Sequence, residues 1–253
     1  MNFTQIYESF QALEHPSFWQ DIYMRFYRSW FDGNRWMQYF EGLGTTVLVT
    51  ILALLIGVIL GVVVAVIRTG HDQQRKGRNN PVLAVLNWIC KIYVTVIRGT
   101  PMLVQLMIMG FVVFKNSRNF TMVGALALGI NSGAYVAEII RGGLMSLDVG
   151  QMEAGRSLGL GYLPTMTYIV VPQAFKAILP ALGNEFITLL KDTSLISAIA
   201  GKEVVYFAKA IGAKTYDYMF PLLIIAVMYL ILVLIFSGLQ GILERRLRAS
   251  DRR

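Results

Sequence analysis

A cation, an anion and two hydroxyl groups follow one another at Lys191, Asp192, Thr193 and Ser194. A zwitterionic ligand needs such a set, because a basic group can hold its carboxylate and an acidic group its ammonium. Neighbouring residues of a helix point about 100° apart, so Lys191 and Asp192 cannot both face one ligand squarely. Either charge could instead pair with another helix, through Glu138 or Arg98, and serve only the packing of the fold. Both interpretations stay open from the sequence.

A second group of polar residues shares one helical face. Asn131, Tyr135 and Glu138 stand at positions i, i+4 and i+7, so they form a single stripe if this segment is helical. The stripe favours a polar pathway. The alternative is a face packed against a neighbouring helix, with Glu138 paired to Arg141 near the water.

Arg98 and Gln105 are a third candidate pair, seven residues apart and so on roughly one face. Pro101 lies between them and removes a helical hydrogen bond, so we expect a bend there. Metal chemistry finds little support, because the chain has one cysteine and two histidines. It also lacks a nucleophile elbow and an H-E-x-x-H motif, so we predict no catalytic residues and no bound metal.

These residues stand in a chain that is too apolar for a soluble domain. Of its 253 residues, 55% are hydrophobic and 15% are charged, whereas soluble proteins carry about 25% charge. This composition also excludes intrinsic disorder. The net charge of +8 suits binding either to nucleic acid or to an anionic membrane surface. Because the chain is so hydrophobic, we predict that it resides in a membrane and does not bind nucleic acid.

Five stretches are long and apolar enough for a membrane helix, which takes about 20 residues. We predict spans at 43–67, 82–115 (with the bend), 121–140, 183–200 and 219–240. The predicted fold is therefore an all-α integral membrane protein with five transmembrane helices. It divides into an external or interfacial N-terminal segment, a transmembrane domain and a basic cytoplasmic tail, at 1–42, 43–240 and 241–253. The aromatic N-terminal segment could lie at the membrane interface or form a structured external extension.

Five spans put the two termini on opposite sides of the membrane. With the N-terminus outside, the inner segments hold twelve Lys and Arg residues and the outer segments eight. The densest basic clusters adjoin the first and last spans. Because cytoplasmic segments are enriched in Lys and Arg, we predict a cell-membrane protein with an external N-terminus and a cytoplasmic C-terminus.

The connection at 141–182 is too long for a simple loop. Asp148 and Gln151 form a capping-box variant that would start a short helix, and Gly159 and Gly161 would end it. On the cytoplasmic side this helix would present Glu153, Arg156 and Ser157 around the small residues Ala154 and Gly155. It could insert into a groove of a soluble partner or lie on the lipid surface.

The same connection carries two recognisable strings, E-A-G-R-S-L-G at 153–159 and I-V-V-P-Q-A at 169–174. Together they resemble the cytoplasmic loop signature of ABC importer permeases, with Gly155 where that family usually has alanine. Three further strings resemble the polar amino acid permeases of that class: R-G-T-P-M-L-V-Q at 98–105, A-Y-V-A-E-I-I-R-G-G-L at 134–144 and L-G-N-E-F-I-T-L-L-K-D-T-S-L at 182–195. The N-terminal segment and the loop at 69–80 are longer than is usual for the family.

The resemblance implies a type I ABC importer permease fold, with two permease subunits, identical or paralogous, forming one pathway in the lipid bilayer. It implies an external substrate-binding protein, an amino acid substrate and a pair of ATP-binding subunits. Those subunits would grip the coupling residues Glu153, Ala154, Gly155, Arg156 and Gly159. This chain has no G-x-x-x-x-G-K-[ST] loop. We therefore predict that it is not an enzyme and binds no cofactor, and that ATP and Mg²⁺ bind in the partner.

The candidate substrate-binding residues are Lys191, Asp192, Ser194, Asn131, Tyr135, Glu138, Arg98 and Gln105. An alternative function is a secondary amino acid transporter, in which carboxylates such as Glu138 and Asp192 would couple transport to an ion gradient. It would work without ATP. The sequence leaves open which amino acid is carried.

Overall fold

The computed structural model describes residues 2–13, 15–74, 80–148 and 150–250. Every regular element in these ranges is helical. In chain order the elements are α1 (Phe3–Gln11), α2 (Phe18–Trp30), η1 (Asp32–Asn34), α3 (Arg35–Asp72), α4 (Pro81–Gly99), α5 (Met102–Ile108), η2 (Met109–Val113), α6 (Phe120–Met145), α7 (Gly150–Ser157), α8 (Tyr162–Thr165), η3 (Met166–Val170), α9 (Val171–Asp192), η4 (Thr193–Ile199), α10 (Val204–Thr215) and α11 (Met219–Ser250).

Five helical segments are long and apolar enough to cross a membrane. They are Asp32–Asp72, Pro81–Gly99, Phe120–Met145, Tyr162–Ile199 and Met219–Leu247. The predicted fold class, an all-α membrane protein with five spans, is confirmed. The basic residues predicted for the first cytoplasmic loop, at 75–78, lie outside the described residues, as do 149 and the last three residues of the tail.

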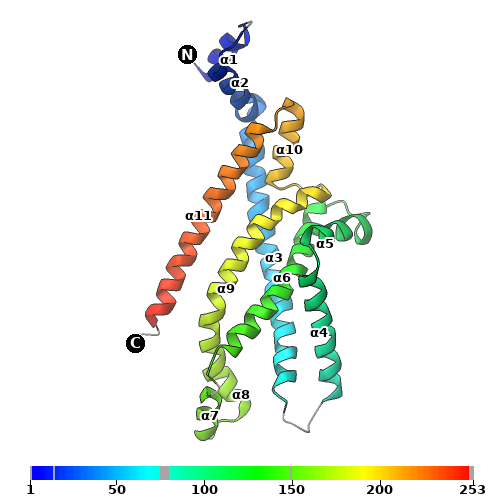
Figure 1. Cartoon of the computed structure of the whole chain (residues 1–253), viewed down its shortest axis with the longest axis vertical. Helices are drawn as coiled ribbons and strands as arrows, with labels where there is room; N and C mark the ends of the chain where they lie inside the picture. Colours follow the sequence, from blue (N-terminus) through cyan, green and yellow to red (C-terminus); the bar gives the residue numbers. More distant parts are fainter. Residues whose placement is uncertain (1, 14, 75–79, 149, 251–253) are drawn as a thin grey trace.

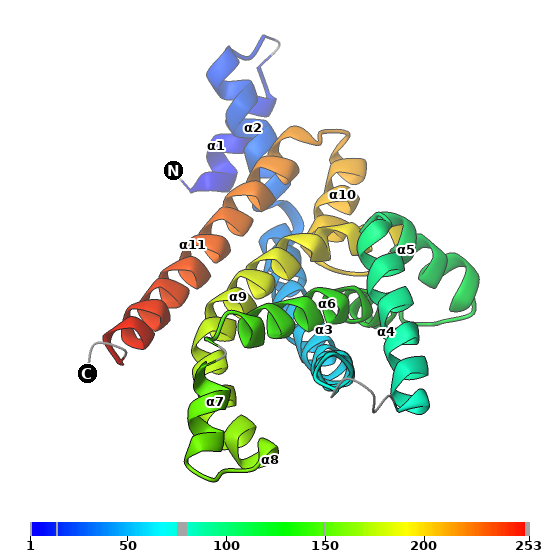
Figure 2. The same cartoon turned by 60° about the horizontal axis from the view of Figure 1, so that its bottom comes forward.

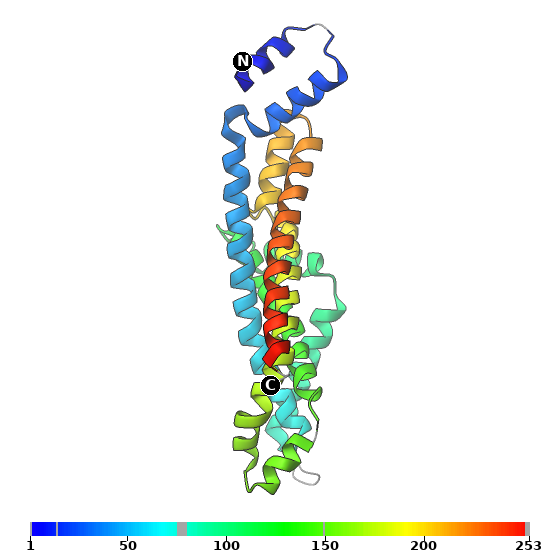
Figure 3. The same ribbon diagram turned by 90° about the vertical axis from the view of Figure 1, so that its left-hand side faces the viewer.

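The helices form an elongated bundle. The long helix α3 runs beside α6 and α9 through its middle (Figure 1). Figure 3 shows α1 and α2 beyond one end of the bundle, with α7 and α8 at the other. Figure 2, turned so that this second end comes forward, shows α7 and α8 projecting from it. The N-terminal segment and the predicted coupling helix therefore lie at opposite ends, as a membrane-spanning arrangement requires.

Small residues bring α3 and α6 into close contact. A Cβ atom added to Gly61 would lie 2.5 Å from Val136 Cγ1, and one added to Gly57 would lie 2.8 Å from Ser132 Oγ. Glycine lets membrane helices approach this closely, so that packing replaces the weak hydrophobic drive between helices in lipid. The polar middle of the third span, around Asn131, is consequently buried between helices.

The predicted bend at Pro101 divides the second span. Helix α4 ends at Gly99 and α5 begins at Met102. The Gln105 side chain bridges the break, because its Nε2 donates to the Ile97 carbonyl oxygen at 2.7 Å and to Thr100 Oγ1 at 2.7 Å. These bonds occupy acceptors that the interrupted helix would otherwise leave unpaired.

The start of the fourth span differs from the sequence-based prediction. The fourth span begins at Tyr162 and runs through α8, η3, α9 and η4, whereas the sequence predicts its start at 183. Pro172 stands at the start of α9, directly after the π-helix η3, and Pro180 lies inside α9. The chain between the fourth and fifth spans forms α10, whose Ala208 and Ile211 pack in a buried cluster with Tyr39 of α3.

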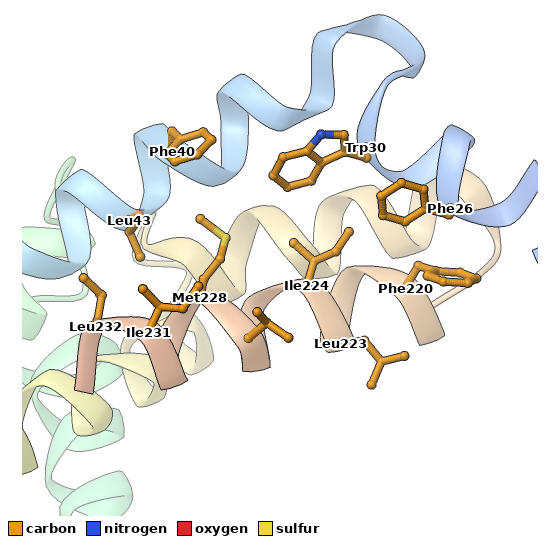
Figure 4. Close-up of a pocket in the computed structure, with 11 residues that line it drawn as sticks. Phe26, Trp30, Phe40, Leu43, Phe220, Leu223, Ile224, Met228, Ile231 and Leu232 are labelled. Atoms are coloured by element: carbon orange, nitrogen blue, oxygen red, sulfur yellow. The ribbon is translucent and has the colours of Figure 1, made fainter. Parts of the chain in front are cut away.

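Aromatic contacts hold the N-terminal helices together. The rings of Tyr7 and Tyr27 stack with centroids 4.5 Å apart, and Tyr27 Oη donates to Thr4 Oγ1 at 2.9 Å. Below this pair, a groove of about 510 Å³ lies between α2, the start of α3 and α11. Its lining is apolar and includes Phe26, Trp30 and Met228 (Figure 4). Because none of the lining residues is charged, the groove does not suit a zwitterionic ligand.

Candidate functional site

A polar cavity of about 170 Å³ lies where the broken second span meets α6 and α9. Its lining residues are Thr100, Met102, Asn131, Tyr135, Glu185, Thr188, Leu189 and Asp192. Three of them, Asn131, Tyr135 and Asp192, are candidates from the sequence. The structure therefore brings together part of the α6 stripe and the acidic residue at the end of α9.

A chain of side-chain hydrogen bonds orients the α6 side of the cavity. Asn131 Nδ2 donates to Gln105 Oε1 at 2.9 Å, and Gln105 itself bridges the break between α4 and α5. The bend at Pro101 is thereby tied to the cavity wall. Gln105 does not line the cavity itself, and it influences the cavity by holding the side chain of Asn131 in place.

Glu185 is a lining residue that the sequence analysis did not select. It stands seven residues before Asp192 on α9, so both carboxylates face the same side of that helix. Ser132 Oγ donates to Glu185 Oε1 at 2.7 Å. The sequence signal for Glu185 is its i, i+7 spacing from Asp192, which places two acids on one face of a helix.

Lys191 and Asp192 point to different surroundings. Asp192 is half-buried in the cavity wall, whereas Lys191 is exposed and does not line the cavity. Among the described residues, the Asp192 carboxylate has no hydrogen-bond or ion-pair partner. Ser194, also half-buried, lies in η4 beyond the cavity lining. The cavity thus presents two carboxylates and no lysine or arginine among its lining residues, an arrangement that attracts a cation.

Glu138 is held below the cavity by arginines from three helices. It forms an ion pair with Arg68 of α3 and accepts a hydrogen bond from Arg141 Nη2 at 3.0 Å. Arg98 Nη1 lies 3.9 Å from its second oxygen. These contacts favour the packing alternative for Glu138, and Arg68 is a partner that sequence reasoning missed. Arg98 also lies over the ring of Tyr135, 5.2 Å from its centroid, and Tyr135 in turn lines the cavity.

The short helix predicted in the long connection is present as α7. Asp148 Oδ1 accepts a hydrogen bond from the Gly150 backbone N–H at 2.8 Å at its start, and Gly159, with φ of +79°, follows its end. Gly155 is buried against Thr165, which lies just beyond in α8, and the exposed residues of the helix are Glu153, Ala154, Arg156 and Ser157. The helix therefore presents a small charged surface and is braced from behind by α8.

Residues 82–249 match the family described as binding-protein-dependent transport system inner membrane component. The chain belongs to this family. It is accordingly a multi-pass permease of the cell membrane and not a catalytic enzyme.

Curated relatives of the permease include amino acid transport proteins. The arginine transport system permease ArtQ of Bacillus subtilis is 41% identical over 169 residues, which are 65% of this chain and 76% of that protein. The putative glutamine transport system permease GlnP of Rickettsia bellii is 37% identical over 67% of this chain and 84% of its own length. The L-cystine transport system permease TcyB of Bacillus subtilis is 39% identical over 64% and 70%.

Two solved structures extend the likeness to three dimensions. The crystal structure of an amino acid ABC transporter with histidines matches with a TM-score of 0.74 at 40% identity, covering 83% of this chain and 94% of that chain. An inward-facing structure of the MetNI methionine ABC transporter matches with a TM-score of 0.69 at 19% identity, covering 85% and 99%. The second match, at this low identity, shows the shared fold alone. Among these comparisons, none favours the secondary transporter.

Proposed function

We propose that the permease is the membrane-spanning subunit of an ATP-driven importer for cationic amino acids. The observation that carries this proposal is the pairing of Glu185 and Asp192 in one cavity that has no basic lining residue. A guanidinium, imidazolium or ammonium side chain would complement these carboxylates, because an isolated charge inside the membrane region is costly unless it is paired. The similarity to the ArtQ arginine permease and to the structure with histidines supports the same substrate class.

The substrate's own charges suggest how it would lie. A cationic side chain would sit near Glu185 and Asp192, while the α-carboxylate would turn toward the guanidinium of Arg98 beside Tyr135. Asn131 and Thr188 would offer hydrogen bonds between these two ends. Lys191, which is exposed, would act outside this cavity.

ATP hydrolysis would occur in a separate pair of ATP-binding subunits, which would also hold the Mg²⁺. Helix α7 is the surface on which they would dock, because its exposed Glu153 and Arg156 lie at one end of the bundle. A second permease copy or a paralogue would complete the pathway, and an external substrate-binding protein would deliver the amino acid. Replacing Glu153 with Ala should reduce co-purification of the ATP-binding subunit without reducing membrane insertion.

The N-terminus would lie outside and the C-terminus in the cytoplasm, in line with the distribution of basic residues. Single cysteines near Asn34 and near Ser250, in a variant without Cys90, would report this orientation through a membrane-impermeant thiol reagent. If intact cells were labelled near Ser250 but not near Asn34, the orientation would be the opposite of the one proposed.

The decisive experiment measures ATP-dependent uptake by the assembled complex in proteoliposomes, with radiolabelled arginine, lysine, histidine and glutamine. Arginine or lysine should be taken up fastest. Asp192→Asn should raise the apparent KM for arginine by about 30-fold or more, as expected when one partner of a desolvated charge pair is removed. Glu41→Gln, which removes an exposed carboxylate from α3, is the matched control. Preferred uptake of glutamine would overturn the cationic substrate class, and uptake without ATP would favour the secondary transporter.

A further inference from the structure

A fully buried carboxyl group lies beyond the outer end of the substrate cavity, at Glu203. It stands between η4 and α10 and caps the first turn of α10. Its two oxygens accept hydrogen bonds from the backbone N–H groups of Val205 at 2.8 Å and Tyr206 at 2.9 Å. A neutral asparagine, serine or threonine would cap a helix equally well. The cap alone therefore does not explain a buried acid at this position.

The third contact of Glu203 leads toward the cavity. Tyr229 Oη donates to Glu203 Oε2 at 3.3 Å and also lies 3.5 Å from Thr193 Oγ1. The Thr193 hydroxyl donates to the Leu190 carbonyl oxygen at 2.7 Å. Thr193 is fully buried and directly follows Asp192, so a continuous series of polar groups joins α10 to the acidic wall of the cavity.

Few charged groups surround this carboxyl. Lys209 of α10 acts on it through its charge, and Tyr229 comes from α11. From α3, Thr46 Oγ1 accepts the Val204 backbone N–H at 3.4 Å, and Tyr39 packs against the same cluster. Burial raises the pKa of Glu203 to about 7, although its hydrogen bonds oppose that shift. The group can therefore gain or lose its proton near neutral pH.

We propose that Glu203 and Tyr229 are positioning residues of the substrate cavity, which hold Thr193, and through it Asp192, from the outer end of the bundle. The proposal rests on the function proposed above. Neither residue lines the cavity, so both act on the substrate only through Asp192.

The single hydroxyl proton of Tyr229 makes this link depend on protonation. When Glu203 is ionised, the phenol donates to the carboxylate and leaves Thr193 without that donor. When Glu203 is protonated, the carboxyl can donate to the phenol oxygen, and the phenol proton can turn to its hydroxyl neighbours Thr193 and Thr46. An unbroken chain of hydrogen bonds then runs from Glu203 through Tyr229 to Thr193. The link between α10 and Thr193 is therefore strongest at pH values below the pKa of Glu203.

The test compares Tyr229→Phe with wild type in the assembled complex, at pH 6 and pH 8. This substitution breaks the link but keeps both backbone hydrogen bonds of the α10 cap. At pH 6 we expect the apparent KM for uptake to rise about three- to tenfold, the usual effect of one lost hydrogen bond. At pH 8 we expect a smaller rise, and at both pH values the maximal rate should stay within about twofold. Glu203→Gln should remove the difference between the two pH values. Tyr218→Phe, at the same end of the bundle but 49% exposed, should behave as wild type.

A second readout does not depend on transport. A spin label on Ser194→Cys, in a variant without Cys90, should become more mobile in Tyr229→Phe at pH 6 than at pH 8. An unchanged KM and label mobility, a KM ratio independent of pH, or failed assembly of Tyr229→Phe would each overturn the positioning role. Absence of uptake of all four amino acids by the wild-type complex would instead overturn the proposed function, while the spin label would still decide this inference.

Discussion

Ser132 and Glu185 are 53 residues apart in the sequence, and the serine Oγ donates to the glutamate Oε1 across the contact between α6 and α9 at 2.7 Å. Ser132 is fully buried, and its Oγ would lie 2.8 Å from a Cβ on Gly57 of α3. One hydroxyl group therefore sits where three spans meet and orients a carboxylate of the cavity. If the cavity binds substrate as proposed, packing and substrate recognition share this position.

Ser132→Ala should weaken substrate binding without disturbing the bundle. The substitution removes the hydrogen bond but not the β-carbon that packs against α3. A hydrogen bond to a charged group contributes about 1.5–3 kcal/mol, so the apparent KM for arginine should rise at least about tenfold. Uptake by the reconstituted complex is the measurement, and Ser9→Ala, whose hydroxyl donates to the Ile6 carbonyl oxygen within α1, is the control. An unchanged KM would mean that Glu185 does not need this donor.

Gly61→Ala should destabilise the contact between α3 and α6. The new Cβ would lie 2.5 Å from Val136 Cγ1, and overpacking of this kind costs about 1–3 kcal/mol. Gly44→Ala is a matched control on the same helix, because a Cβ there meets nothing within 4 Å. The midpoint of thermal unfolding of the detergent-solubilised permease should fall for the first variant only. Equal midpoints for both would show that the helices separate easily at Gly61.

Gly155→Ala should disturb the attachment of α7 to α8, although alanine is usual at this position in the family that the sequence resembles. A Cβ on Gly155 would lie 2.5 Å from Thr165 Cγ2. We expect reduced stimulation of ATP hydrolysis by substrate and binding protein, and rescue by the second substitution Thr165→Ala, which removes the clashing atom. If the double variant instead loses as much stimulation as the two single variants combined, the effect of Gly155→Ala does not come from its contact with Thr165.

Stability should depend on pH through Glu203. Burial raises its pKa from 4.5 to about 7, so the folded protein binds this proton more tightly than the unfolded chain. Its stabilising contribution is complete below the unfolded value and is lost as the pH rises through about 7. Relative to Glu203→Gln, the wild type should therefore lose up to about 3 kcal/mol between pH 4.5 and pH 8. Parallel stability curves for the two proteins across this range would contradict the prediction, and Glu41→Gln serves as the control.

Local patterns of the sequence account for the membrane fold and for several of its details. Long apolar runs predict five spans, because hydrocarbon requires helices that satisfy their own backbone. Pro101 predicts the break between α4 and α5, and Gly159 predicts the end of α7, because each restricts or frees the backbone at its own position. These features depend on a few neighbouring residues, so no knowledge of the tertiary structure is needed to find them.

Tertiary structure alone decided which polar residues meet. The sequence could not show that Glu185 and not Lys191 faces the cavity, because the rotation of α9 about its axis is set by packing against α6 and α11. It could not show that Arg68 pairs with Glu138, since the two helices that carry them are separated by 70 residues of chain. Nor could it show that Glu203 is buried, because an acid in a polar segment between spans ordinarily stays in water. The periodicity of a helix identifies its faces, but only the neighbouring helices determine what each face contacts.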